Sequence, residues 1–309
     1  MKTKMRTMGT MRMVETMCVM AIVMGIIGSM CSCSDGSDAN LNPNLNLDGN
    51  YAGQSKTVKF AVGGDFTMST EIMGKGSLTA DGKAMTDLWV LDYKGGELVQ
   101  QLHQVSGDAD FGEPQMTLDF GAHHIYFVAS RGNEPTLSTD DHIISWVKAS
   151  DTFYKDYALT VNNETQTAQG VTLERRATKV RFTMEDAIPL NTATINMTAS
   201  KWYTSLDYLT GEPVNGVEKT LPITVPNSYL GQTGQSASFF SLSGTEEWTT
   251  NVTVITRKSD ESIISQVQIN SVPLKANRST NYTGRLFEQS PSFALTLNGT
   301  WEDDLELNF

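Results

Sequence analysis

The sequence predicts an all-β protein with two antiparallel β-sandwich domains, and three observations support this prediction. Short runs rich in Thr, Val, Ile, Phe and Tyr recur at roughly 8–15-residue intervals and are separated by polar turns, as in sandwich folds. Runs of helix-forming residues are few. The chain has 309 residues, of which 39% are hydrophobic. At about 100–200 residues per domain, this length accommodates two packed cores.

The N-terminal segment has the composition of a lipoprotein signal peptide. Residues 1–12 are basic, and residues 17–27 form an apolar run too short to span a bilayer, which takes about 20 residues. Small residues and two cysteines follow, so the segment resembles the bacterial lipobox. We predict a signal peptide over residues 1–32 and lipidation of Cys33, because the small Ser32 suits the position before the cleavage site. Cys31, which follows the bulky Met30, is the less favoured site. A secreted protein without lipid is the alternative.

Asn, Asp, Ser and Gly dominate the residues that follow, and we predict a flexible tether over residues 33–56. Residues 34–38 resemble the acidic signal that routes some lipoproteins to the outer face of the outer membrane. Several acyl chains on one cysteine make a stable anchor. We therefore expect a lipid-anchored protein of the cell outer membrane, exposed at the surface. No cysteine follows Cys33, so the domains are expected to fold without disulfides.

The charge of the chain argues against nucleic acid as a partner. Four of the 23 Lys and Arg residues and one of the 35 acidic residues precede Cys33, which leaves 19 basic and 34 acidic residues after it, a net charge of −15. Phosphates would be repelled by so acidic a surface. No stripe of basic residues offsets this repulsion.

Residues 57–165 are predicted to form the N-terminal sandwich. Val58, Phe60 and Val62 alternate with polar neighbours, which is the pattern of a half-buried strand. Two glycines at residues 95–96 predict a hairpin. Ser138 as an N-cap, with Asp141 three residues later, predicts a short helix within residues 138–146. The predicted strands are residues 57–62, 87–93, 97–104, 123–129 and 157–161.

Residues 166–309 are predicted to form the C-terminal sandwich, with the boundary in the polar, turn-like residues 162–170. Val180, Phe182 and Met184 alternate with polar residues, so we predict one long strand over residues 171–184. The other predicted strands are residues 193–198, 221–225, 236–242, 251–257, 262–269, 280–287, 292–298 and 304–309.

Four stretches of the sequence resemble the fimbrillin-like proteins, the subunits and anchors of type V pili. The run LERRATKVRF at residues 173–182 resembles the strand that opens their C-terminal domain. Residues 85–93, 121–130 and 272–287 resemble a first-domain strand, a central strand and the penultimate hairpin. The likeness lies in the order and spacing of these stretches. It implies two transthyretin-like sandwich domains and assembly with other fimbrial subunits by exchange of β-strands.

The resemblance also implies two possible roles. Shaft subunits of the family lose their first strand, and the lipid with it, to an arginine-specific protease. The first Arg after Cys33 is Arg131, so this cut cannot occur in the first strand here, although Lys56 and Lys59 leave a different protease open. We therefore predict a fimbrial anchor or accessory subunit that keeps its lipid. A polymerising shaft or tip subunit is the alternative.

The last residues are a candidate donor strand. In residues 304–309, Leu305, Leu307 and Phe309 alternate with polar residues and share one face. Such a segment can complete an open sheet edge of another subunit. The alternative is that it forms the last strand of its own domain.

Tryptophan and tyrosine suggest a second class of function. Exposed aromatic rings on a β-sandwich can stack on sugars, so a surface glycan-binding lipoprotein is the rival hypothesis. Trp202, Tyr203 and Trp248 are its candidate stacking residues. The ligand would belong to a host or bacterial surface.

The sequence lacks the patterns of catalytic and metal sites. His123 and His124 are neighbours on a predicted strand and therefore point to opposite faces. There is no nucleophile elbow and no glycine-rich phosphate loop. The carboxylates of Asp108, Asp110 and Glu113 are better explained by a loop than by a calcium site. We expect no enzymatic activity, no cofactor and no metal.

Overall fold

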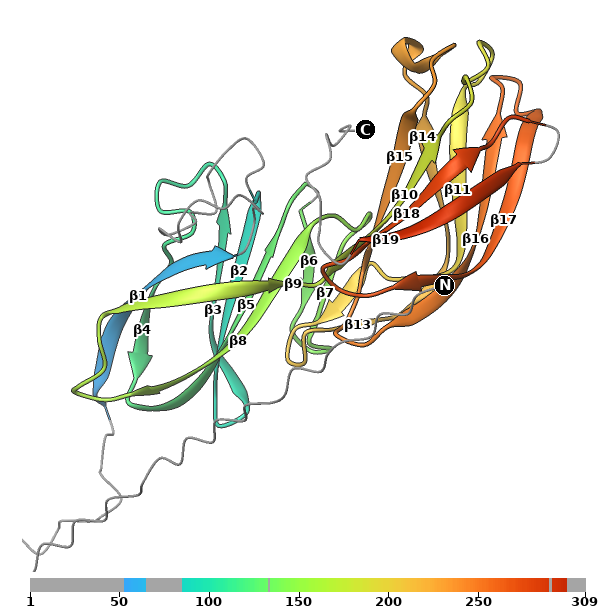
Figure 1. Ribbon diagram of the computed structural model, residues 1–309. Coiled ribbons are helices and arrows are strands. Elements are labelled where there is room, and N and C mark those ends of the chain that lie inside the picture. The colour runs from blue at the N-terminus through green and yellow to red at the C-terminus, as the bar shows by residue number, and fades with distance from the viewer. Residues whose placement is uncertain (1–52, 65–84, 133, 289–290, 299–309) are drawn as a thin grey trace, which may run out of the picture. The chain divides into compact units, whose positions relative to one another are not determined.

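The all-β prediction is confirmed by the computed structural model of the chain (Figure 1). The structure describes residues 53–64, 85–132, 134–288 and 291–298, all within one compact unit, Asn50–Phe309. These residues form nineteen strands, β1 to β19, and one 3-10 turn, η1, at Asn227–Tyr229. None of the described residues belongs to a helix long and apolar enough to cross a membrane.

The first sheet has seven strands in the order β3-β2-β5-β8-β9-β1-β4. β1 runs parallel to β9 and antiparallel to β4, and the other neighbours are antiparallel. β8 and β9 pair through two residues each, Phe153 and Tyr154 opposite Arg175 and Glu174. The strands are β1 (Ser55–Gly64), β2 (Asp87–Lys94), β3 (Glu97–Val105), β4 (Gln115–Asp119), β5 (Gly121–Ser130), β8 (Thr152–Val161) and β9 (Ala168–Arg175).

This sheet folds over on itself around one apolar cluster. Phe60 of β1 contacts Phe127 of β5 edge to face, with ring centroids 5.3 Å apart. The same cluster holds buried side chains of β2, β4 and β9, such as Leu88, Met116 and Val171. The sheet bends at the short pairing of β8 with β9. As a result, β9, β1 and β4 pack against β2, β5 and β8 across this core. The first half of the chain is therefore a two-layer sandwich.

The second sandwich has two four-stranded sheets, β15-β10-β18-β19 and β14-β11-β16-β17. Val180, Phe182 and Met184 of β10 all lie in the core between these sheets, as their alternation predicts. The strands are β10 (Ala177–Met184), β11 (Thr194–Trp202), β14 (Val217–Thr224), β15 (Gln235–Leu242), β16 (Trp248–Arg257), β17 (Ile263–Leu274), β18 (Ser279–Arg285) and β19 (Ser292–Asn298).

A small third sheet, β13-β12-β7-β6, joins strands from both sides of the predicted domain boundary. β7 pairs with β12, and Ile144 lies opposite Leu206. Around this sheet, a third apolar cluster contains Leu91 of β2, Tyr208 and Leu242 of β15. The two sandwiches therefore share a buried contact. The strands are β6 (Thr136–Ser138), β7 (Ile143–Ser145), β12 (Ser205–Asp207) and β13 (Glu212–Val214).

Two tyrosines are hydrogen-bonded inside this third cluster. The hydroxyl oxygens of Tyr93 and Tyr208 lie 2.9 Å apart, and Nδ1 of His142 lies 3.2 Å and 3.3 Å from them respectively. Burial raises the pKa of Tyr208. A buried hydroxyl destabilises the fold unless it is hydrogen-bonded. Here the two hydroxyls and the His142 ring serve as hydrogen-bond partners for one another.

The predicted helix within residues 138–146 is wrong. β6 ends at Ser138 and β7 begins at Ile143, with a turn between them. The Ser138 hydroxyl donates to Oδ2 of Asp141 at 2.9 Å, so the expected capping side chain stabilises a tight turn instead. His142 has a φ of 59°, which no right-handed helix allows.

The predicted long strand over residues 171–184 is two strands in different sheets. β9 ends at Arg175 and β10 begins at Ala177. At Arg176 the backbone N–H donates to the Thr152 carbonyl of the first sandwich, and its carbonyl accepts from the N–H of Ser243 in the second. The chain therefore changes sheets at this residue. The predicted domain bounds stay a prediction, but β9, which follows the predicted boundary, pairs with β1.

Candidate functional site

β1 lies inside the first sheet, between β9 and β4, and is enclosed on both sides. Residues 55–59 pair with β4, and residues 59–64 pair with β9. In the segment just before β4, the carbonyls of Pro114 and Gly112 accept from the N–H groups of Phe60 and Val62, each at 2.9 Å. Val58 and Phe60 are fully buried. Loss of β1 would therefore expose the first core, to which Val58, Phe60 and Val62 belong.

The lysines of β1 are held by neighbouring segments. Nζ of Lys56 donates to the Asn163 carbonyl at 2.9 Å, and Lys59 forms an ion pair with Glu113. Both residues lie within a paired strand. Proteases prefer exposed loop tips to paired backbone, so neither lysine is a ready cleavage site in the folded chain.

β19 is an edge strand with two half-exposed side chains on its core-facing side. Leu295 lies opposite Tyr282 of β18, and Leu297 lies opposite Thr280. Tyr282 and Thr280 are buried, so this face of β19 turns toward the core. Leu295 and Leu297 are nevertheless each 46% exposed.

The outer backbone edge of β19 is also open. Among the described residues no strand pairs with β19 on the side away from β18, so its N–H and C=O groups there can accept a further strand. β19 therefore offers both hydrogen-bonding groups and apolar contacts to an added strand. We call this surface, formed by β19 with Leu295 and Leu297, the β19 edge.

The structure corrects one of the proposed glycan-stacking residues. Trp202 is buried, and its Nε1 donates to the Phe240 carbonyl at 2.8 Å. The pairing of β11 with β14 is irregular between Ala199 and Trp202, which turns Trp202 toward the core. Trp202 is therefore unavailable to a sugar.

Tyr203 and Trp248, the other two candidates, do contact each other. They are half-buried, their ring centroids lie 5.0 Å apart, and their planes are nearly perpendicular at 84°. Nζ of Lys201 lies 5.1 Å from the Tyr203 ring centre. Perpendicular rings do not form the flat platform on which a sugar stacks.

His123 is held in a buried pair. Its Nδ1 lies 2.7 Å from Oδ1 of Asp92, and its Nε2 donates to the Asp119 carbonyl at 2.7 Å. Burial raises the pKa of Asp92, although the hydrogen bond and charge of His123 lower it. Within the described ranges, no group of three His, Cys, Asp or Glu side chains is arranged to hold a metal ion.

Several predicted site residues lie outside the described residues. These are Cys33 and Cys31, the candidate lipidation sites, and Leu305, Leu307 and Phe309 of the candidate donor strand. Leu295 and Leu297 are not among the site residues predicted from the sequence. Their alternation within residues 292–298 is a usable signal for a strand, but not for an edge.

Comparison with known proteins places the chain in a family. Residues 133–308 match the model of a family of unknown function, DUF6562, and the chain belongs to this family. The match covers more than half of the chain and includes the third sheet and the second sandwich. A search of curated proteins finds no match.

Several solved structures resemble the chain. A candidate adhesin from Bacteroides ovatus superposes with a TM-score of 0.51 and 13% identity, over 82% of this chain and 96% of that one. A candidate polysaccharide-binding protein from Bacteroides thetaiotaomicron gives a TM-score of 0.50 and 11% identity, over 79% and 96%. The tip fimbrial protein Mfa3 from Porphyromonas gingivalis, truncated at its C-terminus, gives 0.43 and 13%, over 78% and 99%. At such low identity, the first two of these structures establish a shared fold and nothing further.

Proposed function

We propose that this protein is an outer-membrane lipoprotein that serves as a fimbrial anchor or accessory subunit and contacts other subunits through β-strands. The observation that carries the proposal is the enclosure of β1. This strand is paired on both sides, buried in the first core and preceded by no Arg after Cys33. A subunit that keeps β1 also keeps the N-terminal lipid.

The β19 edge supplies the second part of the proposal. An anchor that retains its own first strand needs another surface for its partner. The β19 edge combines backbone groups that pair with none of the described strands with two half-exposed leucines. Strand addition at such an edge draws affinity from main-chain hydrogen bonds and specificity from alternate side chains.

The shared fold supports a role at the cell surface. The Bacteroides ovatus protein is described as a candidate adhesin, and its chain is covered almost completely by this one. We propose the same setting here, with lipidation at Cys33, surface exposure, no enzymatic activity and no cofactor. The glycan-binding alternative is not favoured, because Trp202 is buried and the Tyr203 and Trp248 rings are perpendicular.

Membrane fractionation tests the anchor. The wild-type chain, Cys33→Ser and the matched control Cys31→Ser are expressed in a bacterium that processes lipoproteins, and soluble and membrane fractions are compared. We expect wild type and Cys31→Ser in the membrane pellet and Cys33→Ser in the soluble fraction. Retention of Cys33→Ser in the pellet would overturn the proposal.

A further inference from the structure

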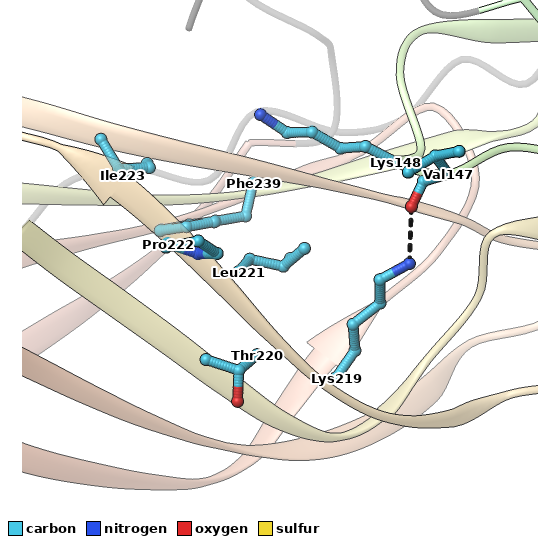
Figure 2. A pocket seen from close by; sticks show the side chains of 8 residues that line it. All are labelled: Val147, Lys148, Lys219, Thr220, Leu221, Pro222, Ile223 and Phe239. Atoms are coloured by element: carbon cyan, nitrogen blue, oxygen red, sulfur yellow. Dashed lines mark hydrogen bonds between the residues drawn. The ribbon is translucent and has the colours of Figure 1, made fainter.

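A pocket of about 270 Å³ opens at one edge of the second sandwich, between β14 and β15 (Figure 2). Leu221 and Ile223 of β14 and Phe239 of β15 line it, and all three belong to the core. Val147 and Lys148, which follow β7, form another wall. The pocket is thus a gap where the two sheets of the sandwich fail to close.

Two lysines, Lys148 and Lys219, also line the pocket. Nζ of Lys219 donates to the Val147 carbonyl at 2.7 Å (Figure 2). In the part of the chain that the structure describes, no carboxylate forms an ion pair with either lysine. Glu218 does not supply one, since neighbouring residues of a strand point to opposite faces.

The lysines are also partly removed from water. Lys148 and Lys219 are both half-buried, and burial lowers the pKa of Lys219. The chain has a formal net charge of −12, so two lysines that form no ion pair with the described carboxylates are unusual beside an apolar pocket. This combination is complementary to a ligand that carries a carboxylate next to an apolar group.

The strand that bears Lys219 limits how such a ligand can bind. β14 is an edge strand, but Pro222 lies within it and has no N–H. Proline is tolerated in an edge strand where its nitrogen faces solvent, so an added strand would miss a hydrogen bond there. Recognition at this edge therefore depends on side chains. The pocket is also smaller than the roughly 300–1,000 Å³ typical of small-molecule sites, which favours a few peptide side chains.

We propose that this pocket binds an extended acidic peptide segment of a partner fimbrial subunit, with a Leu or Phe side chain in the pocket and an Asp or Glu at Lys148 or Lys219. The proposal rests on the proposed function, which supplies a partner subunit. In an extended peptide, residues two apart share a face, so the acid and the apolar residue must be separated by one residue. Residues 301–309 of this chain contain such a pair, Asp303 and Leu305, and give a defined probe.

The test measures binding of a labelled peptide, WEDDLELNF, to the full chain by fluorescence anisotropy. We expect saturable binding that weakens at least tenfold when the peptide carries Asp303→Asn or Leu305→Ser. The protein variant Lys148→Gln/Lys219→Gln is expected to lose affinity by a similar factor. Lys148→Gln alone separates loss of charge from loss of fold, because the Lys148 side chain makes no hydrogen bond to any residue that the structure describes. The matched control Lys275→Gln removes an exposed charge elsewhere and is expected to leave affinity within twofold.

The proposal would be overturned by an absence of saturable binding. It would also be overturned if the Lys148→Gln/Lys219→Gln variant bound the peptide as tightly as wild type does. A chain carrying Asp303→Asn is expected to bind the peptide as well as wild type does. If the Asp303→Asn chain binds the peptide and wild type does not, residues 301–309 of wild type occupy the pocket of their own chain. That result would also overturn the proposal that a partner subunit binds there. The assay needs no lipid, so its failure is distinguishable from failure of anchoring at Cys33.

Discussion

Asp151 and Arg175 form a two-point ion pair where the chain leaves the first sandwich. Nε of Arg175 donates to Oδ1 at 2.8 Å, and Nη2 donates to Oδ2 at 3.1 Å. Both side chains are almost fully buried. Nη1 of Arg175 donates to Asn277 of the second sandwich at 2.9 Å, and the guanidinium lies 4.7 Å from the Phe153 ring centre. One side chain thus connects the two halves of the protein.

Breaking this pair is expected to be costly. Asp151→Ala leaves the Arg175 guanidinium buried without its carboxylate, and we expect the free energy of unfolding to fall by about 3–5 kcal/mol. Urea unfolding measures this change. As a control, Lys155→Gln removes an exposed pair with Glu174 and is expected to cost about 0–1 kcal/mol. Equal effects of the two substitutions would contradict a structural role for the buried pair.

The third cluster predicts that both sandwiches unfold together. Leu206 is fully buried in it, and Leu206→Ala is expected to lower the free energy of unfolding by about 2–5 kcal/mol. Circular dichroism and tryptophan fluorescence of the wild type should give coincident transitions. Leu190→Ala is the control, because Leu190 is 78% exposed and a surface change costs at most about 0.5 kcal/mol. Two separate wild-type transitions would show that the sandwiches are independent.

The Asp92–His123 pair predicts a pH dependence of stability. Burial raises the pKa of Asp92 above its ordinary value of 3.8, so the folded state holds this proton more tightly than the unfolded chain does. The stabilising contribution of this carboxyl is complete below pH 3.8 and is lost as the pH rises through the folded-state pKa. The difference in unfolding free energy between wild type and Asp92→Asn should therefore decrease with pH above about 3.8 and then level off. Urea unfolding across the pH range checks the sign, and a difference that grows with pH would reverse it.

The β19 edge predicts an assembly defect without a folding defect. Leu295→Lys places a charge on the core-facing side of an open edge, where a partner strand would have to bury it. We expect co-purification with other fimbrial subunits to fall at least tenfold, while the urea midpoint stays close to that of wild type. Thr296→Lys changes the next residue, whose side chain points to the opposite face, and should assemble normally. An equal loss in both variants would indicate that the face of β19 is irrelevant.

Alternation along strands predicted the fold class, the strand β1 and the hairpin of β2 and β3, because these features depend on local pattern and turn chemistry. It failed at Ser138, where two strands of three residues each are too short to show a period. β7 pairs on one side with its neighbour β6 and on the other with β12, which lies some 60 residues away, so no local signal identifies the third sheet.

The binding surfaces were harder to predict than the fold. The alternation of apolar and polar residues around Leu295 predicts a core residue. Only the order of strands in the sheet shows that Leu295 lies at an edge. Alternation does not predict whether Trp202 is buried, because the irregular pairing of β11 changes the face of the sheet on which its side chain lies. The lysine-lined pocket depends on Lys148 and Lys219, which are distant in the sequence and line the same pocket only in the folded chain.

Mass spectrometry of the intact protein purified from membranes tests the central claim, that the subunit stays lipid-anchored with β1 in place. We predict an N-terminus at an acylated Cys33, followed by an uncut chain through Ser55–Gly64. An unlipidated chain that begins after Gly64 would show that β1 has been removed and would make the protein a shaft subunit, in contradiction to this account.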